Sequence, residues 1–346
     1  MMRRQVPEQK RVFPYKPQIN ISIPSTTRMW FICGCAFLCI LQSSLNDSGR
    51  SLILAFITLF SALLTEFILT WKEFKFSKIK DGSAAATALI LTLLSPNLIN
   101  PFFSVCAAVF AIVVVKYSFG GLGSNWLNPA LGGWIFIRFS WPSAFSKALS
   151  NSEYTVIEMN KTSQLSVFDN NVTEVLNHSF FSVLDVQLPS GYIDLLFSSS
   201  SGIIADRGLF FLLIGTLIIT AIGINRGWIP LVFLLIYGFL IRFAGGLNGA
   251  FGSGDLIYGL FSGGTIVTAF IIAAEPASSA KLKYGIIFTV ILAAVLSWFF
   301  RYVCGEFFGC LIAVALMNCF TPVICFLEEK IFLSYKNRDK FQESIL

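Results

Sequence analysis

The chain has 346 residues, of which 55% are hydrophobic and 13% are charged, and its mean hydropathy is +0.73. Soluble domains carry about 25% charged residues, so this composition excludes an ordinary soluble fold and predicts an all-α polytopic membrane protein. The net charge of +6 is spread over many loops, which excludes a nucleic-acid partner and leaves membrane lipid as the surroundings. With His178 as the single histidine, we predict no metal site and no catalytic side chain.

Apolar windows of the length needed to cross a bilayer predict about ten transmembrane helices. They lie at approximately 29–45, 51–71, 83–99, 101–118, 128–144, 208–225, 228–245, 256–274, 283–300 and 304–325. The third, fifth and eighth windows are short or interrupted by glycine and proline. Because broken helices are tolerated at depth only where the backbone is buried in protein or lines a cavity, we expect a ligand site there.

The bias of lysine and arginine predicts the topology, since these residues collect on the cytoplasmic side. Most of them fall on the side of the N-terminus, so we expect both termini to be cytoplasmic. The predicted divisions are a cytoplasmic arm (1–28), a first membrane repeat of five spans (29–144), an outer, periplasmic loop (145–207), a second membrane repeat of five spans (208–325) and a cytoplasmic tail (326–346).

A faint internal repeat links the third and eighth windows. Gly-Ser-Ala-Ala-Ala-Thr at 82–87 is similar to Gly-Gly-Thr-Ile-Val-Thr at 263–268, and each stretch runs on to a proline, Pro96 or Pro276. A shift of five spans gives the two copies opposite orientations. This pattern indicates two inverted five-helix repeats, an architecture that places a binding site at the repeat interface. Chance similarity is the alternative.

The most distinctive polar stretch is Phe-Gly-Gly-Leu-Gly-Ser-Asn-Trp-Leu-Asn-Pro-Ala at 119–130. Its glycines, Gly120, Gly121 and Gly123, would let the backbone approach a flat ligand. Asn125 and Asn128 can each donate and accept hydrogen bonds. Composition by itself favours a tight interhelical loop with an asparagine cap before a helix, and a ligand crevice is the alternative.

Ionisable residues inside apolar windows cost about 2.5–3.5 kcal/mol each on insertion scales, so each needs a reason. Glu66, Glu275 and Asp81 lie near the predicted inner mouth, where they are candidates for an ion pathway; pairing with loop lysines, or a helix cap for Asp81, is the alternative. Arg138 lies towards the outer end of its span. It either reaches the outer headgroups or holds an anionic group such as a flavin phosphate.

The eight cysteines, which include Cys33 and Cys35, fall in or near apolar windows and form no Cys-x-x-Cys pair. We interpret them as small buried hydrophobic residues. Contact of Cys33 and Cys35 with a cluster shared with another subunit is the alternative.

Four stretches taken together resemble one family, the D subunits of the Rnf ion-translocating electron-transport complex and the related B subunits of the sodium-pumping NADH:quinone reductase. They are Asp-Gly-Ser-Ala-Ala-Ala-Thr at 81–87, the glycine–asparagine stretch at 119–130, Ala-Ala-Glu-Pro-Ala-Ser-Ser at 273–279 and Leu-Met-Asn before Pro322. The chain length suits the Rnf member of the family.

This resemblance implies an integral subunit that binds flavin, in the inner membrane of a bacterium, in a complex with the A, B, C, E and G subunits of Rnf. Electrons would pass through the complex, coupled to Na⁺ or H⁺ transport, so the chain would be part of a translocase rather than an enzyme alone. A non-covalent riboflavin or FMN is implied near Asn125 and Asn128. The family's Ser-Gly-Ala-Thr motif for covalent FMN is absent, so covalent attachment is doubtful; Thr173 is the threonine closest to the expected place.

Two other classes remain open: a transporter or channel-like protein that uses the inverted repeats, and a structural subunit that has lost its covalent FMN. Flavin content of the purified protein separates them from the electron-transfer interpretation.

Overall fold

The computed structural model describes residues 24–71, 80–121, 123–150, 174–176, 178–179, 192–197, 202–244, 255–280 and 282–343. In this part of the chain all regular structure is helical, and one isolated β-bridge joins Pro96 to Ile203. The all-α prediction is therefore confirmed for these residues.

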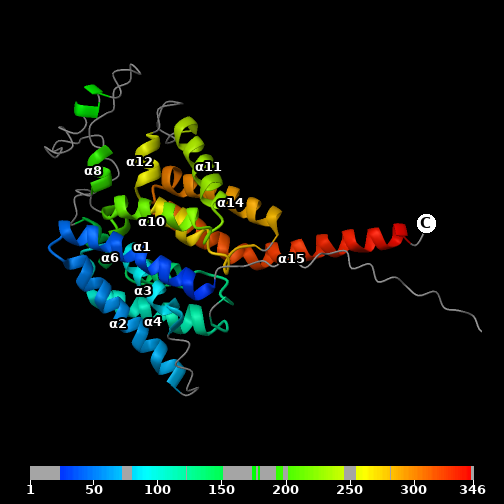
Figure 1. Ribbon diagram of the computed structural model, residues 1–346, viewed down its shortest axis with the longest axis horizontal. Helices are drawn as coiled ribbons and strands as arrows, with labels where there is room; N and C mark the ends of the chain where they lie inside the picture. The colour runs from blue at the N-terminus through cyan, green and yellow to red at the C-terminus, as the bar shows by residue number, and fades with distance from the viewer. Residues whose placement is uncertain are drawn as a thin grey trace, which may run out of the picture.

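The first half of the chain folds into one group of packed helices (Figure 1). It contains α1 (Ser25–Asn46), α2 (Arg50–Trp71), α3 (Ser83–Leu94), α4 (Pro101–Phe110), which continues into the π-helical η2 (Ala111–Tyr117), α5 (Pro129–Ser140) and α6 (Pro142–Ser150). Proline at the first position of α4 and α5 suits a helix start, because its missing N–H has no partner there in any case.

The second half contains α8 (Tyr192–Phe197), α9 (Ile204–Arg207), α10 (Leu209–Ala221), α11 (Trp228–Ala244), α12 (Leu256–Phe261), α13 (Thr265–Val267), the π-helical η5 (Thr268–Ile272), α14 (Lys283–Trp298), the π-helical η6 (Phe299–Val303) and α15 (Gly309–Glu343). α10 packs against α1, which joins the two halves. α15 runs well past the predicted end of its window at residue 325, and its C-terminal part projects from the rest of the molecule (Figure 1).

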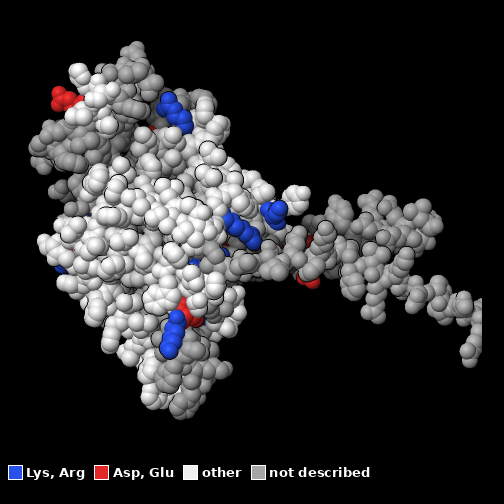
Figure 2. All heavy atoms as spheres, in the orientation of Figure 1, with Lys and Arg blue, Asp and Glu red and all other residues white. Residues whose placement is uncertain are grey.

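Among the described residues, four helical segments are long and apolar enough to cross a membrane: Ser25–Leu45, Arg50–Trp71, Lys283–Val303 and Gly309–Lys330. The same part of the chain has four shorter apolar helices: Ser83–Leu94, Pro101–Tyr117, Leu209–Ala221 and Trp228–Ala244. The face seen in Figure 2 carries few charged side chains over the body of the molecule. Large apolar side chains such as Phe56, Leu235 and Phe239 are exposed, as expected where lipid takes the place of water.

The third window forms a helix that is buried on every side. All twelve residues of α3 are buried, which alanines at three of its first four positions permit because they let neighbouring helices approach closely. In the eighth window the backbone is broken instead into α12, α13 and η5. α3 and the α13–η5 part of the eighth window are thus buried in protein, where a broken helix can be tolerated.

α3 and the α13–η5 segment run antiparallel. Beyond the C-terminus of α3, the Ser95 carbonyl accepts a hydrogen bond from Ile204 N–H, and the side chain of the neighbouring Ile203 contacts Gly264 at the start of α13. At the other end, Ser83 at the start of α3 lines the same cavity as Glu275, which follows η5. The elements that the sequence paired as a repeat are therefore opposite in direction.

Candidate functional site

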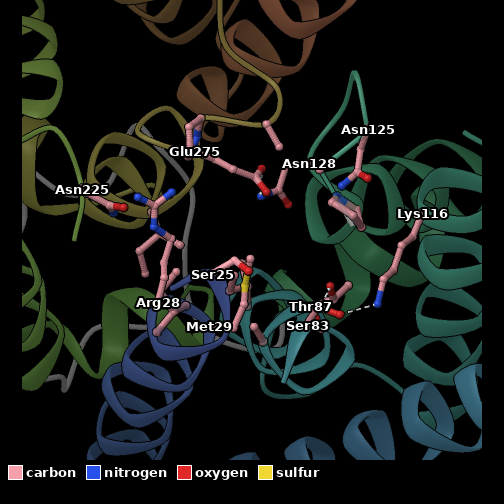
Figure 3. A pocket seen from close by; sticks show the side chains of 18 residues that line it. Ser25, Arg28, Met29, Ser83, Thr87, Lys116, Asn125, Asn128, Asn225 and Glu275 are labelled. Atoms are coloured by element: carbon pink, nitrogen blue, oxygen red, sulfur yellow. Dashed lines mark hydrogen bonds between the residues drawn. The ribbon is translucent and has the colours of Figure 1, made fainter. Parts of the chain in front are cut away.

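A cavity of about 300 Å³ lies between the two halves, at the N-terminal end of α3 (Figure 3). We call it the asparagine cavity. It is lined by Ser25, Arg28, Met29, Ile32, Ser83, Ala86, Thr87, Ile90, Lys116, Gly123, Asn125, Asn128, Pro129, Asn225, Ile271, Glu275, Pro276 and Ala277. Its walls therefore come from α1, α3, η2, the loop before α5 and the turn after η5, and combine apolar surface with a few polar groups, as small-molecule sites do.

The glycine-dense loop owes its shape to backbone conformation. Gly120, Gly121 and Gly123 adopt φ values of 104°, 91° and 89°, which residues with a side chain rarely adopt. A Cβ atom at Gly121 or Gly123 would meet nothing within 4 Å, and only Gly123 of the three lines the cavity. The glycines therefore form the turn that presents the asparagines, and Gly123 also contributes to the wall of the cavity.

Both polar atoms of the Asn128 side-chain amide have hydrogen-bond partners. Its Oδ1 accepts a hydrogen bond from Leu131 N–H at 3.1 Å, so it caps α5, and its Nδ2 donates to Glu275 Oε2 at 2.7 Å. The capping interpretation is thus confirmed for Asn128. The bond to Glu275 also joins the two halves of the chain across the cavity.

Asn125 differs from Asn128 because its carbonyl is not satisfied. It is 3% exposed, and its Oδ1 is a buried acceptor with no hydrogen-bond partner in the described part of the chain. A buried polar atom without a partner costs about 1–3 kcal/mol, so it indicates a missing ligand or water. Asn125 is therefore the polar group of the loop most available to a bound molecule.

Glu275 belongs to the wall of the cavity that the second half of the chain forms. Its Oε2 accepts from Asn128 at 2.7 Å and from the Ser278 hydroxyl at 3.3 Å. Burial raises the pKa of this carboxyl, while the hydrogen bonds from Asn128 and Ser278 oppose the shift. The structure thus places Glu275 at the cavity, across from the other two candidate ion-pathway acids.

Glu66 and Asp81 are linked through a buried lysine. Lys116 Nζ donates to Glu66 Oε1 and to Ser83 Oγ, each at 2.5 Å, and Lys116 and Glu66 are 3% and 1% exposed. Ser83 Oγ donates in turn to Asp81 Oδ1 at 2.7 Å. Asp81 also accepts from Ser83 N–H, as a helix-start carboxylate does. Pairing of Glu66 with a lysine was the alternative interpretation, but the lysine lies inside a helix.

Sequence reasoning missed two cations of the cavity. Lys116 ends an apolar run, so it is an ionisable residue of the same kind as Glu66 and needs a partner as Glu66 does. Arg28 was assigned to the N-terminal arm, although it belongs to α1. Its guanidinium donates to the Ile224 carbonyl at 2.6 Å, and its Nε is buried without a partner in the described chain. Two cations and one acid thus line the cavity, which favours an anionic ligand.

The remaining predicted residues lie elsewhere. Arg138 sits near the other end of α5, where it pairs with Glu306 at 3.2 Å and lies over the Phe145 ring, and it does not line the asparagine cavity. Thr173 lies outside the described residues. Cys33 and Cys35 are buried in α1, and Cys35 packs against Gly215 of α10.

A second buried cation, Arg301, lies on η6 in the second half of the chain. Arg301 of η6 is 6% exposed and donates to the carbonyls of Gly259 and Ser262 at 2.9 and 3.0 Å and to the Tyr237 hydroxyl at 3.2 Å. Asp206, the acid of the predicted outer loop, accepts from the N–H groups of Gly263 and Gly264, both at 2.9 Å. We call these residues the Arg301 cluster.

Substitution of Asn128 should separate its two roles. Asn128→Ala is expected to lower the stability of the purified protein by about 1 kcal/mol, since the α5 cap is lost. Asn128→Ser keeps a capping oxygen while losing the donor to Glu275, so it should restore most of the thermal stability measured by dye-free fluorescence. Equal losses in both variants would show that the bond to Glu275 matters more than the cap.

The chain is similar in sequence to known proteins. The sequence model of the NQR2, RnfD, RnfE family matches residues 12–332. The chain is 25% identical to the D subunit of the proton-translocating ferredoxin:NAD(+) oxidoreductase complex of Clostridium ljungdahlii, over 89% of this chain and 91% of that protein. It is 29% identical to the D subunit of the Na(+)-translocating ferredoxin:NAD(+) oxidoreductase complex of Acetobacterium woodii, over 82% of each chain.

A third relative, the D subunit of the ion-translocating oxidoreductase complex of Psychromonas ingrahamii, is 30% identical over 71% of this chain and 76% of that protein. The family model covers both helical halves, including every element that lines the asparagine cavity. The resemblance seen in the sequence is therefore confirmed, and the chain is a multi-pass membrane protein that belongs to the NQR2, RnfD, RnfE family.

Proposed function

We propose that this chain is the flavin-binding membrane subunit of an Rnf-type complex that couples electron transfer to the transport of Na⁺ or H⁺. The observation that carries the proposal is the asparagine cavity, which is lined by two cations, Arg28 and Lys116, and one acid, Glu275, and by Asn125, whose buried Oδ1 has no partner among the described residues. The relatives named above are D subunits of ion-translocating oxidoreductase complexes, which supports the same assignment.

The residues present fit a flavin. Ile90, Ile271 and Met29 offer apolar surface for a flat ring system, and Asn125 Oδ1 can accept from a ring N–H. The Nε of Arg28 is a buried donor for a ring carbonyl or for a phosphate. When bound, the flavin would supply one- or two-electron transfer. Asn128 would act indirectly, because its amide already holds α5 and Glu275.

We further propose that the two halves are inverted repeats, each with five crossings and with both chain ends cytoplasmic. Three structural parallels support this. Gly82 and Gly264 both adopt left-handed φ values, 74° and 70°, at the starts of α3 and α13. Both fourth helices end in π-helix, at η2 and η6. Each π-helix carries a buried cation that contacts the first residue of the short helix: Lys116 contacts Ser83, and Arg301 contacts Thr265.

These contacts pair Gly82 with Gly264, one residue later than the sequence match does. The start of a helix and the residue that a buried cation can reach are fixed by geometry, whereas a short sequence match can be shifted by one residue. In the proposed repeats Gly82 therefore corresponds to Gly264.

The expected result for purified protein is that riboflavin or FMN is released on denaturation, and that Asn125→Leu lowers its occupancy at least tenfold. Loss of a buried hydrogen bond and a misfit apolar side chain account for a change of about 1.4 kcal/mol or more. The measurement is flavin fluorescence of the extract per mole of protein.

Asn97→Leu is the matched control. Asn97 is also a buried asparagine with an unpartnered Oδ1, 5% exposed, but it does not line the cavity. Equal flavin loss in both variants would reflect general misfolding. Absence of any flavin from the purified complex would overturn the proposal and favour a transporter or a structural subunit. A flavin that stays attached after denaturation would place a covalent site in the outer loop, at Thr173 first.

A further inference from the structure

We propose that the Lys116 ammonium is a mobile counter-ion shared between Glu66 and the asparagine cavity, so that negative charge arriving in the cavity makes Glu66 take up a proton. The inference rests on the proposed function, because it needs a redox-active occupant, and it adds a device that links the cavity to proton uptake. It is built from residues on α2, α3 and η2 that contact one another directly.

Lys116 lies between Glu66 and the asparagine cavity. Among the residues described in the structure, it is the one that both lines this cavity and donates a hydrogen bond to the Glu66 carboxylate. Its Nζ lies between Glu66 Oε1 and Ser83 Oγ, and Figure 3 shows it directed at the wall formed by Ser83 and Thr87. A long, flexible side chain at this place can turn from the acid towards the cavity.

Glu66 depends on Lys116 for the balance of its charge. Glu66 is 1% exposed, and its Oε2 has no partner in the described chain. Its charge is balanced by Lys116, with a further hydrogen bond from the Tyr117 hydroxyl at 3.1 Å. Removing one partner of a buried ion pair leaves the other charge uncompensated, which costs about 3–5 kcal/mol. Protonation of Glu66 removes that cost, so loss of the cation and gain of a proton are linked.

A chain of hydrogen bonds connects Lys116 to a partly exposed acid. Asp81 lies at the start of α3, and its side chain is joined to Lys116 through the Ser83 hydroxyl. Asp81 is partly exposed, whereas Ser83, Lys116 and Glu66 are buried. This chain of polar groups leads from the partly exposed Asp81, along one wall of the asparagine cavity, to Glu66. The ionisable groups along it are Asp81, Lys116 and Tyr117, and Glu275 faces the cavity from the other wall.

The step balances in charge. One electron, supplied by an iron–sulfur donor, adds one negative charge in the cavity beside Lys116. Lys116 Nζ gives one proton to Glu66 Oε1, to which it is hydrogen-bonded, and regains one from a solvent hydronium ion by way of Asp81 and the Ser83 hydroxyl. Lys116 therefore turns towards the added charge as an ammonium, and Glu66 holds one more proton. Removal of the electron draws Lys116 back to Glu66, which expels the proton.

The test is infrared difference spectroscopy of the purified complex, reduced minus oxidised. In the wild-type complex we expect a carbonyl band from a protonated carboxyl group to appear on reduction, to shift in deuterium oxide and to vanish in Glu66→Gln. In Lys116→Met the band should already be present in the oxidised state, so that it disappears from the difference spectrum. Lys116→Arg keeps a cation and should retain the redox-dependent band.

Flavin content is measured on the same samples, which keeps the two proposals apart. Normal, reducible flavin without a Glu66-dependent band would overturn the counter-ion role and leave the proposed function intact. Absence of flavin from the wild-type complex would overturn the proposed function, and with it the link between reduction and proton uptake by Glu66. Should Lys116→Met fail to accumulate, Lys116→Met combined with Glu66→Gln removes both charges. That variant should bind flavin with a lowered midpoint potential, and an unchanged potential would contradict a cation beside the cavity.

Discussion

Gly208→Ala is expected to disrupt the junction between α1 and the second half of the chain, with a loss of at least several degrees in the thermal transition of the purified protein. Gly208 lies between α9 and α10, directly against Cys39 of α1. A Cβ atom at this position would overlap the Cys39 carbonyl oxygen and its sulfur. Backbone cannot yield as a side-chain tip can, so the cost should reach or exceed the usual 1–3 kcal/mol of overpacking.

Gly34→Ala is the control for that substitution. Gly34 lies on α1 as well, but a Cβ atom there would meet nothing within 4 Å. Alanine has the higher helix propensity by about 1 kcal/mol, so stability should be unchanged or slightly raised. Size-exclusion profiles and dye-free fluorescence melting compare the variants. An undisturbed Gly208→Ala protein would show that α1 and α10 are not packed as closely as described.

Arg301→Leu is expected to be the most damaging single substitution in the second half of the chain. The guanidinium satisfies the carbonyls of Gly259 and Ser262 and the hydroxyls of Ser262 and Tyr237. Leucine would leave these groups buried without partners, at about 1–3 kcal/mol for each unsatisfied group. We expect little folded protein in detergent, assessed by yield and by thermal melting.

Arg301→Lys should recover only part of that stability, because one ammonium cannot reproduce a planar guanidinium that serves several acceptors. Arg138→Gln is the matched control in the first half. Arg138 pairs with Glu306, whose side chain is 42% exposed, and partly exposed ion pairs contribute about 0–1 kcal/mol. Comparable losses of stability for Arg301→Leu and Arg138→Gln would show that the buried hydrogen bonds of Arg301 stabilise the protein no more than a partly exposed ion pair does.

Local composition predicted the helical content and the segments where the chain breaks. Hydropathy averages over about 20 residues, so it reports whether a segment is apolar, and each predicted window does contain a helix. The same averaging hides a single charge: Lys116 follows three valines and is outweighed by them. Its partner Glu66 is 50 positions away, and no local rule relates the two.

The asparagines illustrate the same division. The order Asn-Pro at 128–129 was sufficient to predict the helix cap, because a cap is a contact within one turn. It could not show that Asn128 also holds Glu275, 147 positions later, or that Asn125 is left with a free buried oxygen. Those outcomes depend on which helices pack together across the molecule.

The sequence by itself determined that this is an all-α membrane protein of the NQR2, RnfD, RnfE family, and it located the loop at 119–130, because these properties follow from local composition and motif order. Only the tertiary structure decided which charges meet. It joined Glu66 to Lys116 and Glu275 to Asn128, and it paired Arg138 with Glu306. The physical reason is that a buried charge must find a partner in space, and packing of distant helices, rather than spacing along the chain, supplies it.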